Sequence, residues 1–319
     1  MLGERLVSRR MTLWAVQEPM PKSHLLKSLI VLALSLHAVW VASAWNRSTD
    51  IRHGRDFASY YYASKAVQSG GNPYSKAELG RYAKQERTRS SVHPFLYPPT
   101  FLLMMEWTRP LSLQTSFRLW FWFGELAALA ALLAMWRWTR PLGPGVSTLC
   151  VVVFSICTAV PNNHAMGQAN FIVLLVVLLA FLFEANGRSV LAGVCLGLGI
   201  LMKISPVLIV FFWIVERRWK TIGIAILTCA FGHLLVLSVY GNHVLEQFYL
   251  EVFPGFASGV YNGLRVPIGM FGNHSLPNLW HQWMPSPGQG LSIGAQWASR
   301  VTTVFLVVST LWCLSLIHI

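Results

Sequence analysis

The stretch LLKSLIVLALSLHAVWVASAW, residues 25–45, decides the fold class of this chain. Its only formal charge is Lys27, and a helix that crosses a bilayer needs about 20 mostly apolar residues. Several more apolar runs follow. Of 319 residues, 54% are hydrophobic and 12% are charged, whereas a soluble domain carries about 25% charged residues. The sequence therefore predicts an all-α fold, a polytopic bundle of transmembrane helices.

The basic residues outnumber the acids and give a net charge of +13. They stand in short groups between the apolar runs, as the positive-inside rule predicts, and do not form the continuous basic face of a nucleic-acid-binding domain. The cysteines lie within apolar runs without a CxxC pair: Cys150, Cys157, Cys195, Cys229 and Cys313. We therefore expect no nucleic-acid partner, disulfide framework, metal site or cofactor, because nucleotide-binding and metal-binding motifs are also missing.

The arginine-rich residues 1–24 predict a cytoplasmic N-terminal segment. Residues 25–319 then form a single transmembrane domain, with residues 46–94 as its first external loop. Because Ala42-Ser43-Ala44 resembles a signal-peptidase site, a cleaved signal peptide is the alternative to a membrane anchor. The long polar leader and the many later apolar runs favour the anchor.

Ser116–Trp138 predicts a full span, and the basic residues at its end, Arg137 and Arg140, are expected inside. Phe95–Arg109 would be only about 22 Å long as a helix, so we interpret it as a re-entrant or strongly immersed segment. As a full span, it would place those arginines outside. Further apolar runs continue the bundle: Val146–Val160, Phe171–Phe183, Val190–Met202, Val207–Val215 and Ile222–Tyr240.

Two polar stretches and the C-terminus complete the predicted topology. Pro161–His164 and Gly167–Asn170 predict an external turn, and residues 241–299 predict a second external stretch rich in glycine, proline, tryptophan and histidine. Residues 301–319 begin a last span that no charged tail follows. Because spans usually end in charged flanks, we expect that the sequence is truncated at its C-terminus.

The first external loop carries the strongest candidate for chemistry, Asp56. Asp56–Gln68 and Ser75–Arg87 predict two amphipathic helices, the second with a capping box of Ser75 and Glu78. A carboxylate at the membrane surface can accept the proton of a hydroxyl group as a general base. The alternative is that Asp56 caps its helix, a position where aspartate is favoured. The local sequence favours the cap.

Two cations are candidates for binding a phosphate group. Lys203 interrupts an apolar run, and an ionisable group there indicates function. Its alternative is a side chain that snorkels to the membrane surface. Arg55 lies in the external loop, where a substrate phosphate and anionic lipid headgroups are equally good explanations.

Other polar residues carry weaker predictions. Gln168 and Asn170 have amides that bind sugar hydroxyls or satisfy helix ends, and the second role is favoured. Tyr97, before Pro98-Pro99, is either a site residue or an interfacial anchor at a helix start. His164 and His274 are lone histidines, for which an ordinary structural role is more common than a functional one.

Short motifs spread over residues 25–279 together resemble glycosyltransferase family 87 of the GT-C superfamily. That family includes polyprenol-phosphate-mannose-dependent α-1,2-mannosyltransferases. Lys203 is followed by Ile204-Ser205-Pro206 where a proline often follows directly, and the chain ends before the last spans that members normally have. The motifs, in family order, are Gly54–Phe57, Tyr60–Ala63, Gly71–Tyr74, Phe95–Pro99, Gly167–Asn170, Ala192–Gly197 leading to Lys203, and Asn273–Leu276.

The resemblance implies a GT-C-like enzyme in a bacterial plasma membrane, with its site on the periplasmic face. Asp56 would be the base in a metal-independent, inverting transfer of a hexose, expected to be mannose. The donor would be a polyprenyl-phosphate sugar, its phosphate held by Arg55 and Lys203, and the acceptor a lipid- or glycan-linked hydroxyl. Membrane lipids are the other partners. The remaining substrate-binding residues would be Tyr60, Tyr97, Gln168, Asn170 and His274.

Two other classes of protein remain as alternatives. A transporter or flippase of lipid-linked saccharides would share a cavity with phosphate-binding cations but would need no base. A membrane scaffold would need no pocket that joins Asp56, Lys203 and His274. The three-dimensional arrangement of these residues therefore discriminates among the hypotheses.

Overall fold

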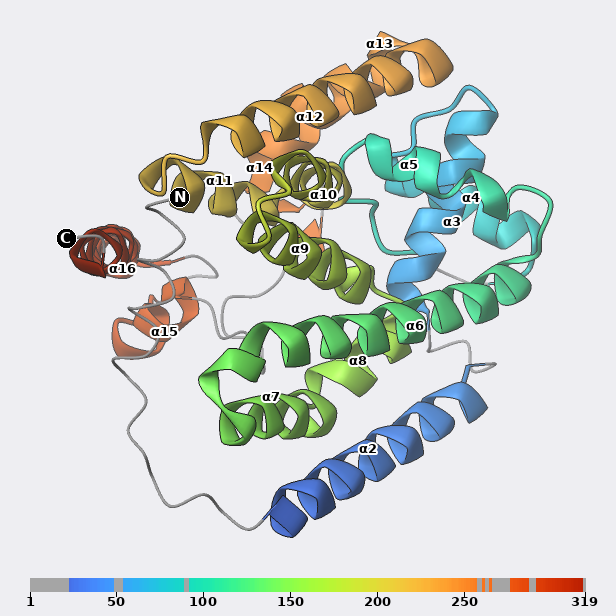
Figure 1. The fold of residues 1–319 in the computed structure, drawn as a ribbon. Helices are drawn as coiled ribbons and strands as arrows, with labels where there is room; N and C mark the ends of the chain where they lie inside the picture. The colour runs from blue at the N-terminus through green and yellow to red at the C-terminus, as the bar shows by residue number, and fades with distance from the viewer. Residues whose placement is uncertain are drawn as a thin grey trace.

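The computed structural model describes residues 23–48, 54–88, 92–256, 260–261, 264–265, 276–286 and 291–317. Within these ranges the chain is almost entirely helical (Figure 1). The exception is a two-residue antiparallel pair, β1 (Val260–Tyr261) and β2 (Leu264–Arg265), in which Val260 lies opposite Arg265. The predicted all-α fold is confirmed.

Three helices of the described part of the chain are long and apolar enough to cross a membrane. They are α2 (Ser23–Asn46), α6 (Leu113–Thr139) and α12 (Trp219–Tyr240). A bent pair, α7 (Pro144–Ile156) and α8 (Ala159–Met166), would make a fourth span, broken by 44°. The bend follows Cys157, whose ψ of 127° is outside the helical region. The predicted apolar runs Leu25–Trp45, Ser116–Trp138 and Ile222–Tyr240 therefore exist as single long helices, whereas Val146–Val160 is divided between α7 and α8.

The long helices pack in a row. α2 lies against α7, α7 against α6, and α6 against α9 (Asn170–Ala185). α9 contacts α10 (Ser189–Met202), which contacts α12 (Figure 1). Gly193 of α10 allows this last contact, because a Cβ atom there would lie only 2.6 Å from the carbonyl oxygen of Thr221. Small residues allow close helix contacts of this kind in membranes.

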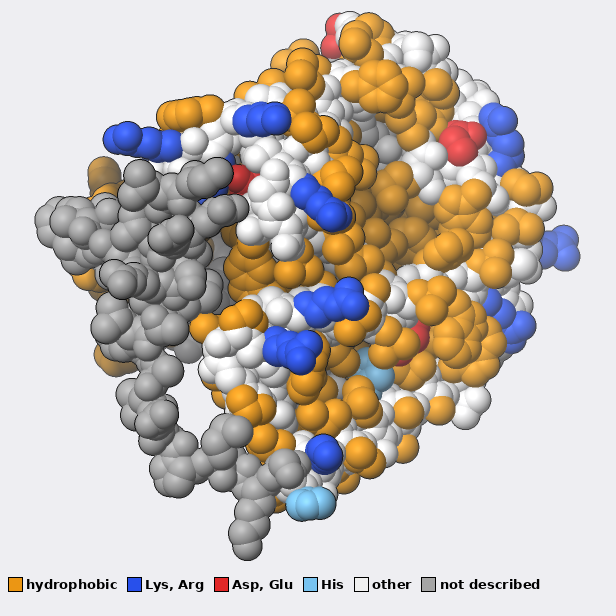
Figure 2. All heavy atoms as spheres, in the orientation of Figure 1, with side chains coloured by type: hydrophobic (Ala, Val, Ile, Leu, Met, Phe, Trp, Pro, Cys, Tyr) orange, Lys and Arg blue, Asp and Glu red, His pale blue; other side chains and the backbone are white. Residues whose placement is uncertain are grey.

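The outer faces of this row are apolar. Large hydrophobic side chains such as Leu126 on α6 and Phe231 on α12 are more than 60% exposed. Figure 2 shows hydrophobic side chains over much of the visible surface, with lysine and arginine in separate patches. Water would disfavour such a surface, whereas lipid does not. The molecule is an integral membrane protein.

Outside this row and residues 54–109, the other helices of the described chain are short or lie near the C-terminus. They are η3 (Arg140–Leu142), η4 (Ser205–Val207), α11 (Leu208–Val215), α13 (Asn242–Glu246), the π-helix η5 (Gln247–Val252), α14 (Phe253–Phe256), α15 (Leu276–Trp283) and α16 (Ile293–Ile317).

Residues 46–94, which the sequence predicts as an external loop, contain the two predicted helices, α3 (Arg55–Gln68) and α4 (Lys76–Gln85). Ser75 caps α4 by accepting a hydrogen bond from the Glu78 amide at 3.3 Å. The Glu78 carboxylate accepts a hydrogen bond from the backbone N–H of Asn72. The second bond of the predicted capping box, from the backbone N–H of Ser75 to Glu78, is therefore not formed. α3 is more buried than a surface amphipathic helix, with ten of its 14 residues buried.

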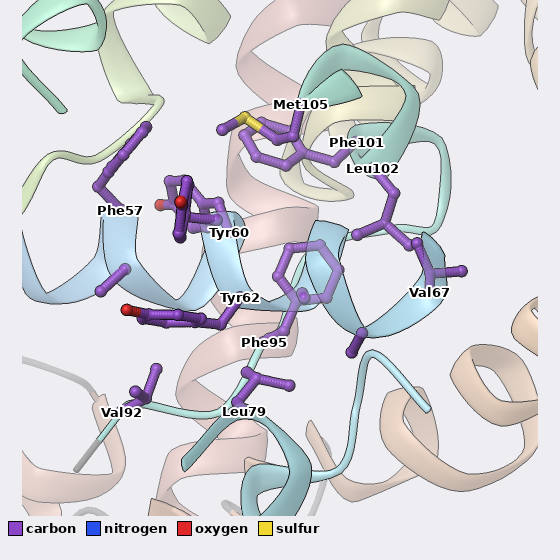
Figure 3. Packing of buried hydrophobic residues seen from close by; sticks show 14 of the residues in the cluster. Phe57, Tyr60, Tyr62, Val67, Leu79, Val92, Phe95, Phe101, Leu102 and Met105 are labelled. Carbon is purple, nitrogen blue, oxygen red and sulfur yellow. The ribbon is translucent and has the colours of Figure 1, made fainter. Parts of the chain in front are cut away.

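The main core surrounds α3 (Figure 3). Tyr60 packs edge-on against Phe101, with ring centroids 4.9 Å apart and an interplanar angle of 71°. Phe57, Phe95 and Met105 belong to the same buried cluster. α3 therefore has the fixed surroundings that can hold functional side chains in place.

Phe95–Arg109 does not form a continuous span. It contains α5 (Thr100–Met104) and the 3₁₀ turn η2 (Glu106–Thr108), which contradicts the alternative of a full helical span. The predicted turn at Pro161–His164 is wrong, because these residues belong to α8. Pro161 lies in the first turn of α8, where a helix needs no N–H donor from it.

Candidate active site

A cavity of about 490 Å³ opens beside the N-terminal end of α3. Apart from tyrosines, its ionisable side chains are Asp56, His93 and Lys203. Drug-sized ligands occupy pockets of about 300–1,000 Å³, so the volume suits a sugar with a phosphate. The full lining consists of Asp56, Ser59, Tyr60, His93, Pro94, Leu96, Tyr97, Pro98, Gln168, Lys203, Ile204, Ser205 and Phe256.

Asp56 reaches the cavity because α3 starts in close contact with α8. Gly54, at the N-cap position, has φ +62° and donates its amide hydrogen to the Ala165 carbonyl at 2.7 Å. A Cβ atom on Gly54 would lie 3.0 Å from the Phe117 ring, so both the conformation and the space favour glycine. Asp56 is the second residue of α3 and its carboxylate bonds other groups, which contradicts the capping alternative.

A second left-handed glycine places Gln168 beside Asp56. Gly167 ends α8 with φ +71°, and its carbonyl accepts a hydrogen bond from the Trp120 indole at 2.9 Å. A Cβ atom on Gly167 would lie 2.7 Å from the Cβ atom of Phe57. The turn between α8 and α9 can therefore pack directly against α3 because this residue has no side chain.

A chain of hydrogen bonds joins the acid to the lysine. Gln168 Nε2 donates to Asp56 Oδ2 at 2.7 Å. Asn170 Nδ2 donates to Gln168 Oε1 at 2.8 Å, and Lys203 Nζ donates to Asn170 Oδ1 at 2.8 Å. Because an ammonium only donates and a carboxylate only accepts, the two ends fix the orientation of both amides.

Lys203 is placed by the end of α10. The helix stops at Met202, and Lys203 is extended with φ −155° and ψ 134°. The Thr100 hydroxyl donates to the Leu201 carbonyl at 2.5 Å, which attaches α5 to this helix end. An ammonium carries three hydrogens. Since one is bonded to Asn170, two remain available to a ligand in the cavity.

His93 is a site residue that the sequence did not reveal. Its Nδ1 lies 3.1 Å from Asp56 Oδ1, so the carboxylate is contacted at both oxygens. Local sequence offers one relevant observation, which is that His93 lies two positions before the Phe95–Pro99 motif. A single loop histidine at that distance does not by itself indicate a site.

Two tyrosines form a hydroxyl pair in the cavity wall. Tyr60 donates to the Tyr97 hydroxyl at 2.8 Å. Burial raises the pKa of Tyr97 to about 12 and raises the pKa of Tyr60 well above its usual value. Both hydroxyls therefore keep their protons at neutral pH. Tyr60 uses its hydrogen in the bond to Tyr97, so the hydrogen of Tyr97 is the one that a polar substrate can accept.

The other predicted site residues lie in different places. Arg55 is exposed and does not line the cavity. Asn170 links Gln168 to Lys203 from outside the cavity lining. His164 is buried and bonds Glu125 at 3.0 Å, away from this lining. His274 is outside the described residues.

Together these residues supply a proton acceptor, a cation and a neutral hydroxyl donor, Tyr97, around one space. An acid with free lone pairs can remove a proton from a hydroxyl group. A nearby ammonium can stabilise negative charge that develops on a leaving phosphate. The arrangement is therefore suited to transferring a group from a phosphate to a hydroxyl.

Comparison with known sequences gives one match. Residues 95–318 match the sequence profile of glycosyltransferase family 87. The matched region includes Gln168, Asn170 and Lys203 and begins after Asp56 and His93. Searches of curated proteins and of solved structures each found no significant match.

Proposed function

Because the chain belongs to glycosyltransferase family 87, we propose that this membrane glycosyltransferase moves a hexose, specifically mannose, from a polyprenyl phosphate to an acceptor hydroxyl. The observation that supports the proposal most is the position of Asp56 and Lys203 in the wall of one cavity. The acceptor in this proposal is a lipid- or glycan-linked sugar. An enzyme of this kind needs a base and a phosphate site, whereas a flippase needs only the second.

Asp56 serves as the general base in the proposed reaction. The acceptor hydroxyl gives its proton to an oxygen of Asp56 while its own oxygen bonds to the anomeric carbon of the donor. The bond from that carbon to the phosphate oxygen breaks, and the lipid phosphate leaves with the electron pair. Attack from the face opposite the phosphate inverts the configuration at the anomeric carbon. The reaction needs no additional cofactor.

Lys203 meets the donor phosphate in this mechanism. The free ammonium hydrogens of Lys203 bind phosphate oxygens and stabilise the charge that grows on them as the bond breaks. Tyr97 supplies a neutral hydroxyl for the sugar or the phosphate. Arg55 is not given this role, because its exposed side chain is outside the cavity lining.

The proposed topology has the cavity on the external side of the membrane and the N-terminus in the cytoplasm. The positive-inside pattern supports this topology. The arginine-rich residues 1–24 precede α2, and Arg137 lies in the last turn of α6. In a bacterium, this places transfer on the periplasmic face of the plasma membrane, where a polyprenyl-phosphate donor can reach the site from the bilayer.

The direct test uses membranes that contain the full chain. They are incubated with polyprenyl-phosphate-mannose labelled in the sugar, and the labelled products are separated and identified. We expect labelled glycolipid or glycan to appear with inverted anomeric configuration. Membranes without the chain are the control. Labelled donor that crosses the bilayer without forming a product would instead indicate a flippase.

A further inference from the structure

The Asp56 carboxylate is held at both oxygens by residues from two distant parts of the chain. Gln168 Nε2 lies 2.7 Å from Oδ2, and His93 Nδ1 lies 3.1 Å from Oδ1. The side chains of Asp56 and His93 are 22% and 38% exposed, and both line the cavity. The acid is therefore fixed in orientation while it stays accessible to a ligand.

The charge of Asp56 determines which imidazole nitrogen carries hydrogen. An ionised carboxylate accepts hydrogen bonds and donates none. His93 therefore donates from Nδ1, so its neutral tautomer carries hydrogen on that nitrogen. The same carboxylate also fixes the Gln168 amide with its nitrogen towards Asp56. Among the described residues, Lys203, Tyr60 and Tyr97 interact electrostatically with Asp56, and Arg55 precedes it in the chain with an exposed side chain. The two tyrosines are neutral at neutral pH.

The backbone around His93 restricts where this imidazole can go. The residue before a proline is confined to extended conformations, and His93 precedes Pro94. Val92 and Phe95 on either side are buried, 3% and 0% exposed. The backbone that carries the Oδ1 anchor is therefore held by packing on both sides.

We infer that His93 is a positioning residue for the base, a role that rests on the proposed function of Asp56. Its Nδ1–H group holds the carboxylate so that a remaining lone pair meets the acceptor hydroxyl. Without it, the carboxylate can rotate about its last bond and leave the reacting position. A displacement of about 1 Å can lower a reaction rate by about 100-fold.

Two substitutions separate the donated hydrogen bond from the rest of the imidazole. In His93→Asn, the amide nitrogen lies close to the former position of Nδ1 and can still donate to Asp56. In His93→Phe, the ring remains but the donor is lost. Transfer of label from polyprenyl-phosphate-mannose to the acceptors of isolated membranes is measured at saturating donor, together with the donor concentration for half-maximal rate.

We expect His93→Phe to lower the maximal rate about 10- to 100-fold without changing the half-saturating donor concentration. His93→Asn should recover most of that loss. Equal rates in the two variants would overturn the positioning role.

A measurement without substrate tests the contact itself. The full chain is labelled with ¹⁵N-histidine, and the His93 signals are identified by their loss in His93→Asn. At about pH 9, where an ordinary imidazole is neutral, we expect hydrogen on Nδ1 in the wild type and a change of tautomer in Asp56→Ala. An unchanged tautomer would overturn the inference. If this tautomer result holds while Asp56→Asn keeps full transfer, the proposed base is wrong and the contact is not.

Discussion

Two carboxylates in this molecule are each held by two side chains from other elements, yet their surroundings differ. Glu125 of α6 lies 3.0 Å from His37 Nε2 on α2 and 3.0 Å from His164 Nε2 on α8. Glu125 is 5% exposed and the two histidines are 3% and 4% exposed. Asp56 also has a partner at each oxygen, but it lines a cavity.

The difference shows that access, more than residue type, separates a site from a structural contact. An ionisable group within a membrane bundle is a functional candidate by default, and a Glu–His pair fits that description. In the sealed Glu125 cluster, both oxygens bond histidines and the bonds connect three helices. In the open Asp56 network, lone pairs face a space that a substrate can enter.

The two regions meet at one turn of the chain. His164 of the sealed cluster lies three residues before Gly167, and Gln168 of the open network follows it. The cluster thus helps to fix the end of α8, on which the network depends. We therefore expect changes at Glu125 to act on stability and changes at Asp56 to act on chemistry.

Asp56→Asn should have the largest effect on activity. The amide keeps the size of the side chain but cannot accept the acceptor's proton. Because general-base catalysis contributes about 10²- to 10⁴-fold, transfer from labelled polyprenyl-phosphate-mannose should fall by that factor. The melting temperature of the purified protein in detergent should remain close to that of the wild type.

Glu125→Gln is the matched control for this change, since it makes the same chemical substitution in the sealed cluster. It should lower the melting temperature and leave most of the transfer rate in the protein that remains folded. If Asp56→Asn keeps full transfer activity, Asp56 is not the general base.

Glu125→Ala should have the largest effect on stability. It removes the hydrogen-bond partner of a buried ring nitrogen on both His37 and His164, and each buried polar group left unsatisfied costs about 1–3 kcal/mol. Unfolding of the detergent-solubilised protein by heat or denaturant would show this loss. A variant of normal stability without transfer activity would mean that the sealed cluster takes part in the reaction.

Much of the fold was predictable because its main determinant is local. The length and apolar character of α2, α6 and α12 are visible in any window of the sequence. The burial of α3 was not predictable, because the rings that cover Tyr60, such as Phe101 and Trp120, lie 41 and 60 positions away in the sequence. Pro161 suggested a break, but it occupies the helix position where proline is tolerated.

The candidate site was predictable in its residue types and not in its contacts. The aspartate at the start of a predicted helix, the lysine within an apolar run and two amides each indicated either function or an ordinary structural role. Their connection depends on a hydrogen bond between residues 112 positions apart, from Gln168 to Asp56. His93 gave no such indication, since its role depends only on its distance to Asp56 in space.

Gly167→Ala should disturb the turn that connects the two regions. A left-handed conformation costs an alanine about 1–2 kcal/mol, and moving the Phe57 or Phe117 side chain adds about 1–3 kcal/mol. Gly70→Ala is the control, because Gly70 has φ +73° and a Cβ atom there would have nothing within 4 Å. Unfolding free energies should fall in both variants and more in Gly167→Ala, which alone should lose transfer activity. Equal losses in both would mean that the close packing at Gly167 contributes nothing.

Lys203→Met should have the smallest effect, and it tests the far end of the open network. Hydrogen bonds to charged groups contribute about 1.5–3 kcal/mol, so binding of polyprenyl-phosphate-mannose to the purified protein should weaken about 10- to 100-fold. Lys203→Arg keeps the charge and should bind more tightly than Lys203→Met. Lys76→Met removes an exposed lysine of α4 and should not change donor binding. If Lys203→Met binds the donor normally but unfolds as easily as Glu125→Ala, Lys203 is a structural contact like Glu125, and only the Asp56 end of the network belongs to the site.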